Sequence, residues 1–232
     1  MSLNKCRFIG VVFMLTIFLI TGVAGAQTQR ILLVGDSWTA LMWDYRSFQT
    51  ALSDSGLSQF EENGNIVRSG SRAVEWAQQS WLDDITTELT NNPTIDIVHL
   101  SMGGNDILAA PSQYDTAMET IFDDIDTVVN HILSIRPDIR CAISGYDYIL
   151  DAGGLHPQLQ RFAEEAVDRT SVNPRFFYIN SHGLAHYTLG YPGEFAAGER
   201  PKPGGYPDYT PLMGGDPVLP GHSNAFVDDI HY

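Results

Sequence analysis

The chain has 232 residues, of which 28 are acidic and 13 basic, so its formal net charge is −15 and its pI is about 4.6. A chain this acidic is repelled by nucleic acids and by anionic membrane surfaces, which argues against both as partners. The length suits one domain with a sizeable hydrophobic core.

Residues 1–26 have the pattern of a secretory signal peptide. Lys5 and Arg7 form a basic start, and the uncharged apolar run 8–23 is followed by a small-residue Ala-Gly-Ala cleavage signal. The alternative is an uncleaved anchor, although the run falls slightly short of the roughly 20 residues of a membrane span. We therefore expect a mature chain of 27–232 that is secreted or periplasmic and makes no stable membrane insertion.

The mature chain is more acidic still and keeps a single cysteine. All 28 acidic residues lie in it, against 11 basic residues once Lys5 and Arg7 are removed from the 13, so its formal charge is −17. Such a charge keeps an exported protein soluble and says little about a neutral ester or sugar substrate. Because Cys6 lies in the signal peptide, Cys141 has no partner for an intrachain disulfide, and its apolar neighbours predict a buried thiol.

Downstream of the signal peptide, short apolar runs alternate with stretches of helical periodicity. In chain order the strands are predicted at 31–34, 65–67, 95–100, 139–143 and 176–179, and the helices between them at 41–52, 73–89, 113–135 and 159–167. The first run is continuously apolar, as in a parallel strand covered on both faces. The alternation predicts one α/β domain in which helices sandwich a parallel sheet.

The stretch 181–224 departs from this alternation, because it is rich in Gly, Pro and Tyr and has little periodicity. Irregular segments of this length inside a domain are commonly functional lids or disordered. Its tyrosines could form an aromatic rim for a sugar or an acyl chain, and the alternative is a surface loop. These tyrosines are Tyr187, Tyr191, Tyr206 and Tyr209.

Three short motifs carry the chemistry, and each has a plain structural alternative. Gly35-Asp36-Ser37 directly follows the first strand, where a serine hydroxyl lies near a helix N-terminus; alternatively, Ser37 is only the helix N-cap. Gly103-Gly104-Asn105-Asp106 follows the third strand and offers an amide donor for an oxyanion, or else forms a turn. Asp228 lies three residues before His231, a spacing that lets the carboxylate orient the imidazole as a general base; alternatively, this is a surface histidine beside acidic residues.

In this order and at these relative positions, the motifs resemble the conserved blocks of the SGNH (GDSL-like) hydrolases. Gly35-Asp36-Ser37 is similar to the first block, Gly103-Gly104-Asn105-Asp106 to the third, and Asp228 with His231 to the Asp-x-x-His of the last. Gly70, just after the second strand, stands where the second block has its glycine, and this match is the least specific. The resemblance covers most of 27–232.

The resemblance implies a flavodoxin-like three-layer α/β/α sandwich whose five parallel strands have the order 2-1-3-4-5. It also implies a secreted serine esterase, in which Ser37 attacks an ester carbonyl to form an acyl-enzyme, His231 is the general base and Asp228 orients it. The oxyanion hole is then formed by the backbone N–H groups of Ser37 and Gly70 and the side-chain amide of Asn105. No metal or organic cofactor is implied, and Asp36 and Asp106 are expected to be structural.

The implied substrates are carbohydrate O-acetyl groups, short-chain acyl esters, lysophospholipids or acyl thioesters, and export of the chain favours carbohydrate esters. One departure from the family is that members usually continue past the histidine into a helix, whereas this sequence stops at Tyr232. This departure favours the alternative of a weakly active or inactive SGNH-fold module that binds a glycan or cell-wall ligand.

Other residue patterns give no further evidence for a function. His99 lies within a predicted strand and is expected to be a core residue. His182 and His186 have helical spacing but lack the intervening glutamate of a zincin, so no metal site is expected. Gly-x-Ser-x-Gly, Gly-x-Gly-x-x-Gly and Walker-type phosphate loops do not occur, which disfavours an α/β-hydrolase elbow and a flavodoxin-like nucleotide binder.

Overall fold

The structure, a computed structural model, describes residues 28–109, 114–146 and 156–181. Several sequence predictions therefore lie outside the described residues. These are the signal peptide 1–26, the general base His231 with its partner Asp228, and all of the Gly/Pro/Tyr-rich stretch 181–224 except Ser181.

The described residues form a five-stranded parallel sheet with the order β2-β1-β3-β4-β5. This order confirms the predicted flavodoxin-like α/β class. The strands are β1 (Thr28–Gly35), β2 (Phe60–Val67), β3 (Ile97–Ser101), β4 (Arg140–Ser144) and β5 (Phe176–Ile179).

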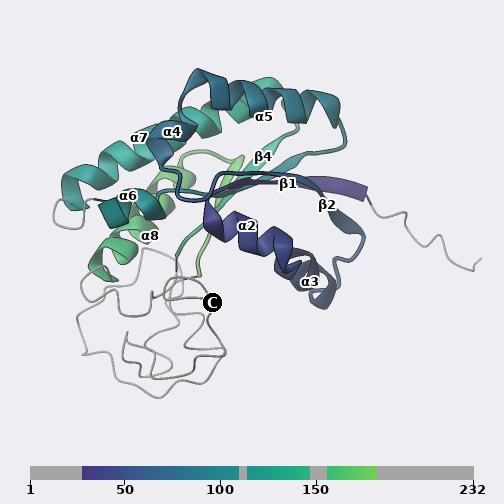
Figure 1. The fold of residues 1–232 in the computed structure, drawn as a ribbon, viewed down its shortest axis with the longest axis horizontal. Helices are drawn as coiled ribbons and strands as arrows, with labels where there is room; N and C mark the ends of the chain where they lie inside the picture. The colour runs from purple at the N-terminus through teal and green to yellow at the C-terminus, as the bar shows by residue number, and fades with distance from the viewer. Residues whose placement is uncertain (1–27, 110–113, 147–155, 182–232) are drawn as a thin grey trace, which may run out of the picture.

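Helices cover both faces of the sheet. In Figure 1, α5 and α7 lie above the strands, and α2 and α3 lie below them. Helix α8 packs against α7 through the rings of Phe162 and Phe122, whose centroids are 4.8 Å apart. The helices are α2 (Ser37–Asp44), α3 (Ser47–Asp54), α4 (Ala73–Trp76), α5 (Gln79–Asn91), α6 (Gly104–Ala109), α7 (Tyr114–Ile135) and α8 (His156–Ser171).

Three predicted boundaries were wrong. The helix expected over 41–52 is two helices, because Arg46 adopts a left-handed backbone conformation with φ 54° between α2 and α3. The helix expected over 73–89 is likewise divided into α4 and α5. Strand β2 begins at Phe60 rather than at 65, since it pairs only with β1 among the described strands and this edge position accepts polar residues.

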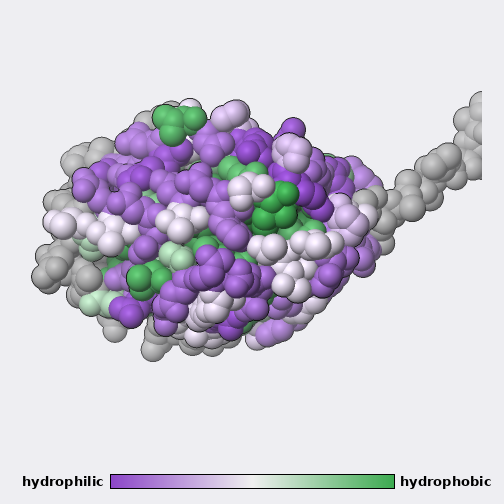
Figure 2. Space-filling view, turned by 90° about the horizontal axis from the view of Figure 1, so that it is seen from above, coloured by the Kyte–Doolittle hydropathy of each residue, from purple (hydrophilic) through white to green (hydrophobic). Residues whose placement is uncertain are grey.

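The core lies on both sides of the central strands. Residues 31–34 of β1 are almost fully buried, as their continuous apolar run predicts, and Trp76, Phe122 and Phe162 have no exposed surface. Burying each such side chain contributes roughly 1.5–3 kcal/mol relative to leaving it in water. The outer face over α5 and α7 is mostly hydrophilic, with small separate hydrophobic spots (Figure 2). Within the described residues, no helix has the length and apolar character needed to cross a membrane.

Cys141 of β4 is fully buried, as its neighbours predict. Burial raises the pKa of its thiol to about 12. Because the thiolate is the reactive form, this cysteine is unreactive at neutral pH.

His99 of β3 is a core residue, as predicted. It is 2 % exposed, and its imidazole lies 5.0 Å from the ring of Phe48 on α3. Burial lowers the pKa of His99 from its ordinary 6.5 to about 4, so the folded protein holds the imidazole neutral. Stability contributed by this neutral form is fully present above pH 6.5 and is lost as the pH falls toward 4, because the unfolded chain then binds the extra proton.

We expect His99→Leu to remove this acid sensitivity. Over the interval from pH 7 to pH 4, the unfolding free energy of the wild type should fall by about 3 kcal/mol more than that of the variant. Urea denaturation at a series of pH values measures the difference. His131→Leu, a change at a partly exposed histidine of α7, is the control. Parallel pH curves for the wild type and His99→Leu would contradict the account.

Candidate active site

The motif residues that the structure describes meet at the carboxyl edge of the sheet. Helices α2, α4 and α6 lie near the ends of β1, β2 and β3 at this edge, on the left in Figure 1. In an open α/β sheet, this is the edge where ligands bind. The candidate site is therefore built by three loops that are far apart in the sequence.

In the first motif, Asp36 rather than Ser37 caps the helix. Its Oδ1 accepts a hydrogen bond of 3.0 Å from the backbone N–H of Trp38, and Ser37 is the first residue of α2. The alternative interpretation of Ser37 as the N-cap is therefore wrong. Ser37 is half-buried, and it lies at the N-terminus of α2, where the helix dipole favours negative charge.

Gly35 is required by the close approach of β1 to the end of β3. A Cβ atom at this position would lie 2.1 Å from the carbonyl oxygen of Ser101 and 2.5 Å from Oγ1 of Thr39. The next backbone N–H, that of Asp36, donates to the same Ser101 carbonyl at 3.0 Å. The glycine thus brings the nucleophile loop against the end of β3, just before the loop that carries Gly103-Gly104-Asn105-Asp106.

Gly70 lies on an exposed turn that is tied to the first motif. The backbone N–H of Arg68 donates to the carbonyl of Gly35 at 2.9 Å, and that of Ser71 closes the turn on Arg68 at 3.0 Å. Gly70 has φ +78°, and nothing lies within 4 Å of the place a Cβ would take. The glycine is therefore needed for its backbone conformation and not for space.

The Gly103-Gly104-Asn105-Asp106 motif is bound to the segment just after Gly70 by two hydrogen bonds. Nδ2 of Asn105 donates to the carbonyl of Ser71 at 2.9 Å, and Oδ2 of Asp106 accepts from the backbone N–H of Ala73 at 2.8 Å. Burial raises the pKa of the Asp106 carboxyl, and the hydrogen bond from Ala73 opposes this rise. Asp106 holds its loop, as predicted for a structural residue.

Sequence reasoning missed Tyr146, which follows β4 at the same edge. Its hydroxyl donates to Oδ2 of Asp36 at 2.9 Å, and Oγ of Ser101 donates to Oδ1 at 3.1 Å. Asp36 is 1 % exposed, so the carboxylate depends on these donors, as expected of a structural residue. The one available signal was position, since Tyr146 lies just beyond the carboxyl end of a predicted strand.

The structure thus joins Ser37, Gly70 and Asn105, the three predicted oxyanion-hole residues, through their loops. The predicted general base and its acid partner are not among the described residues, so their placement stays a prediction. No group of three His, Cys, Asp or Glu side chains in the described ranges is arranged to hold a metal ion. The same edge of the sheet thus carries a serine at a helix N-terminus and a side-chain amide, two groups that acyl transfer uses.

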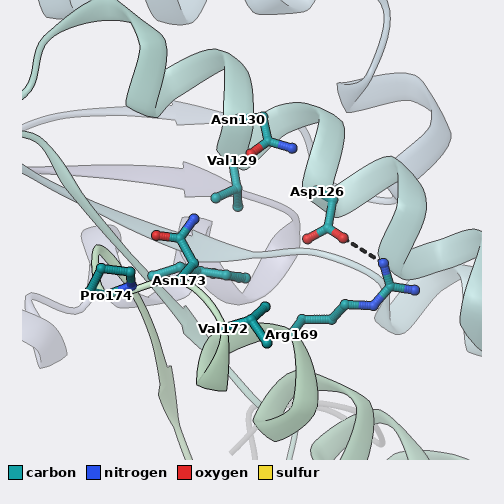
Figure 3. A pocket seen from close by; sticks show the side chains of 8 residues that line it. Asp126, Val129, Asn130, Arg169, Val172, Asn173 and Pro174 are labelled. Atoms are coloured by element: carbon teal, nitrogen blue, oxygen red, sulfur yellow. Dashed lines mark hydrogen bonds and ion pairs between the residues drawn. The ribbon is translucent and has the colours of Figure 1, made fainter.

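A separate cavity of about 440 Å³ lies between α7, α8 and the start of β5, away from this edge. Figure 3 shows Asp126 of α7 and Arg169 of α8 joined on one side of it, at 2.5 Å. Arg169 also pairs with Glu165 at 2.8 Å and with Asp123 at 3.1 Å. These carboxylates hold the guanidinium in place, so we interpret the cluster as ion pairs that join α7 to α8.

Neither a protein-family model nor a curated protein sequence matches the chain. Solved structures do. A family 3 carbohydrate esterase from Clostridium thermocellum has a TM-score of 0.46 and 19% identity, covering 66% of this chain and 78% of its own. An extracellular lipase from Streptomyces rimosus has a TM-score of 0.48 and 15% identity, covering 80% and 97%. A phospholipase A1 from Streptomyces albidoflavus has a TM-score of 0.43 and 12% identity, covering 81% and 96%. The likeness to these three structures is one of fold alone.

Proposed function

We propose that this chain is a serine esterase of SGNH type that hydrolyses carboxylic esters through an acyl-enzyme on Ser37. The observation that carries the proposal is the joining of three motif loops at one sheet edge. The carbonyl of Gly35, next to Ser37, accepts a hydrogen bond from the Arg68 N–H, and the carbonyl of Ser71, next to Gly70, accepts one from the Asn105 amide. Loops with only separate turn or cap roles would not need to be bound to one another.

The proposed reaction has two halves. Ser37 Oγ attacks the acyl carbon while His231 Nε2 takes the hydroxyl proton, and the leaving alcohol then receives that proton. In the second half, water loses a proton to His231 and attacks the acyl-enzyme, and the proton returns to Ser37 as the acid departs. Asp228 orients the imidazole and stabilises its charged form.

The tetrahedral oxyanion is held by the backbone N–H groups of Ser37 and Gly70 and by the amide of Asn105. A side-chain amide carries two N–H groups. One of those of Asn105 is given to the Ser71 carbonyl, which orients the amide and leaves the other to be directed at substrate. A donor held in place before the reaction costs no reorganisation when negative charge develops.

The helix dipole adds to this stabilisation. Ser37 is the first residue of α2, an eight-residue helix, so its own N–H group is at the positive end. Negative charge at a helix N-terminus is favoured by about 0.3–1 kcal/mol at exposed sites and by up to about 2 kcal/mol in partly buried ones.

The substrate class we propose is a carbohydrate O-acetyl or short-chain acyl ester, encountered outside the cytoplasm. The signal-peptide pattern of 1–26 supports export, and the acidic charge of the mature chain argues against a polyanionic substrate. Initial rates on p-nitrophenyl acetate, butyrate and octanoate would define the acyl preference, which we expect to favour the shorter esters.

The test of the nucleophile is labelling of the intact 27–232 protein with a fluorophosphonate, because only an activated serine reacts. We expect one adduct, on the peptide that contains Ser37, located by mass spectrometry. Ser47 is a matched internal control, since it is the exposed first residue of α3, another eight-residue helix on the same side of the sheet. Absence of an adduct on folded protein would overturn the esterase proposal and favour a non-catalytic binding module.

A further inference from the structure

Tyr146 occupies a central position behind the candidate site. Its side chain is 4 % exposed, and its ring meets Trp38 edge-on at 6.2 Å and Phe162 edge-on at 5.5 Å. A Cβ on Gly104 would lie 2.7 Å from the same ring. The ring therefore packs both against Trp38, in the first turn of the helix that carries Ser37, and against Gly104, the residue before Asn105.

The hydroxyl of Tyr146 is one of the donors to a buried carboxylate. It donates to Oδ2 of Asp36, while Oδ1 accepts from Ser101 Oγ and from the backbone N–H of Trp38. Burial, together with the nearby carboxylate, raises the pKa of the Tyr146 phenol well above its ordinary value. The phenol therefore keeps its proton, and can donate it in a hydrogen bond, at neutral pH.

The ordinary explanation of such a contact is that a buried tyrosine hydroxyl needs some partner. In this case the partner, Asp36, is itself part of the candidate site. Asp36 is the N-cap of α2 and the residue directly before Ser37, so a rotation of its carboxylate would break the hydrogen bond that holds the Trp38 N–H in the first turn, next to the nucleophile. A misplacement of about 1 Å at a reacting group can cost about a hundredfold in rate.

We propose that Tyr146 is a positioning residue for the esterase reaction, acting through Asp36 on Ser37 and through Gly104 on Asn105. This inference rests on the proposed function of the site. If the site is an esterase site, Tyr146, just beyond β4, aligns the nucleophile Ser37 at the end of β1 with the oxyanion donor Asn105 at the end of β3.

Tyr146→Phe tests this directly, because it keeps the ring and removes only the hydroxyl. We expect kcat for p-nitrophenyl acetate to fall by about 10- to 100-fold, with KM within about twofold of the wild type. Tyr178→Phe is the matched control. Tyr178 is also a buried tyrosine, on the neighbouring β5, and its hydroxyl lies 3.4 Å from Oδ1 of Asn180.

A double-mutant cycle with Asp36→Asn separates positioning from general destabilisation. If Tyr146 acts through Asp36, the double variant should be about as active as Asp36→Asn alone, whereas independent effects would multiply. The positioning role is overturned if Tyr146→Phe keeps kcat within about twofold of the wild type, if it loses no more activity than Tyr178→Phe, or if the two losses multiply.

A second readout does not need catalysis. The Trp38 backbone amide donates to Asp36, so in Tyr146→Phe its proton resonance should move upfield and its hydrogen exchange should accelerate by about tenfold, unlike in Tyr178→Phe. If the wild type hydrolyses no ester and takes no fluorophosphonate, the esterase proposal fails. The Trp38 amide then still decides whether Tyr146 orders this turn, and an unchanged amide would overturn the inference.

Discussion

Replacing Ser37 by alanine is expected to lower kcat for p-nitrophenyl acetate by about 10⁴- to 10⁶-fold, the size of loss seen when a hydrolase loses its nucleophile. The reason is chemical, because alanine has no atom that can form the acyl-enzyme. The fold should remain, since Ser37 is half-buried and the cap of α2 is provided by Asp36. Steady-state kinetics beside a thermal melt would check both statements.

The matched control for this prediction is Ser47→Ala. Both serines are the first residue of an eight-residue helix, so both changes have the same effect on helix propensity. We expect Ser47→Ala to retain activity within about twofold and to melt as Ser37→Ala does. Equal activity of Ser37→Ala and Ser47→Ala would show that Ser37 is not the nucleophile.

Replacing Asn105 by alanine should produce the second largest effect, a fall in kcat of about 10²- to 10³-fold with a small change in KM. The lost amide donates to charge that exists only in the transition state, so substrate binding is nearly unaffected. The change also removes the hydrogen bond to the Ser71 carbonyl and loosens the turn that presents Gly70. Both consequences weaken the same oxyanion hole.

Asn92→Ala provides the comparison for Asn105→Ala. The Asn92 amide also donates to a backbone carbonyl, that of Glu88 at 3.1 Å, at the end of α5 and away from the candidate site. The two variants should lose similar unfolding free energy, about 1 kcal/mol each, while only Asn105→Ala loses activity. A rate for Asn105→Ala that matched the rate for Asn92→Ala would remove the amide from the oxyanion hole.

The class of the fold could be predicted from local patterns. The apolar run at 31–34 and the helical periodicity between the strands can be recognised from neighbouring residues alone. The structure confirms the parallel α/β sheet that they predict. Strand β2 was underpredicted because an edge strand buries less and therefore carries less apolar signal. The break at Arg46 was missed because a left-handed residue interrupts a helix without changing its periodicity.

Local patterns also predicted residues of the candidate site, but only as separate motifs and not as one site. Ser37 and Asn105 were found from short motifs and Gly70 only from the family resemblance, and the pairing of His231 with Asp228 stays a prediction from spacing. What joins the described residues could not be found by pattern. The bonds from Asn105 to Ser71, from Ser101 to Asp36 and from Tyr146 to Asp36 span 34, 65 and 110 residues of sequence.

The sequence by itself determined which residue types follow each strand, because strand and helix formation depend on neighbours within a few positions. Only the tertiary structure decided that these residues share one edge, since parallel strands bring distant segments together at their carboxyl ends. It also gave Asp36 the cap, required glycine at position 35 and placed Tyr146 behind the nucleophile. Those assignments depend on the distance between strands, which no local pattern records.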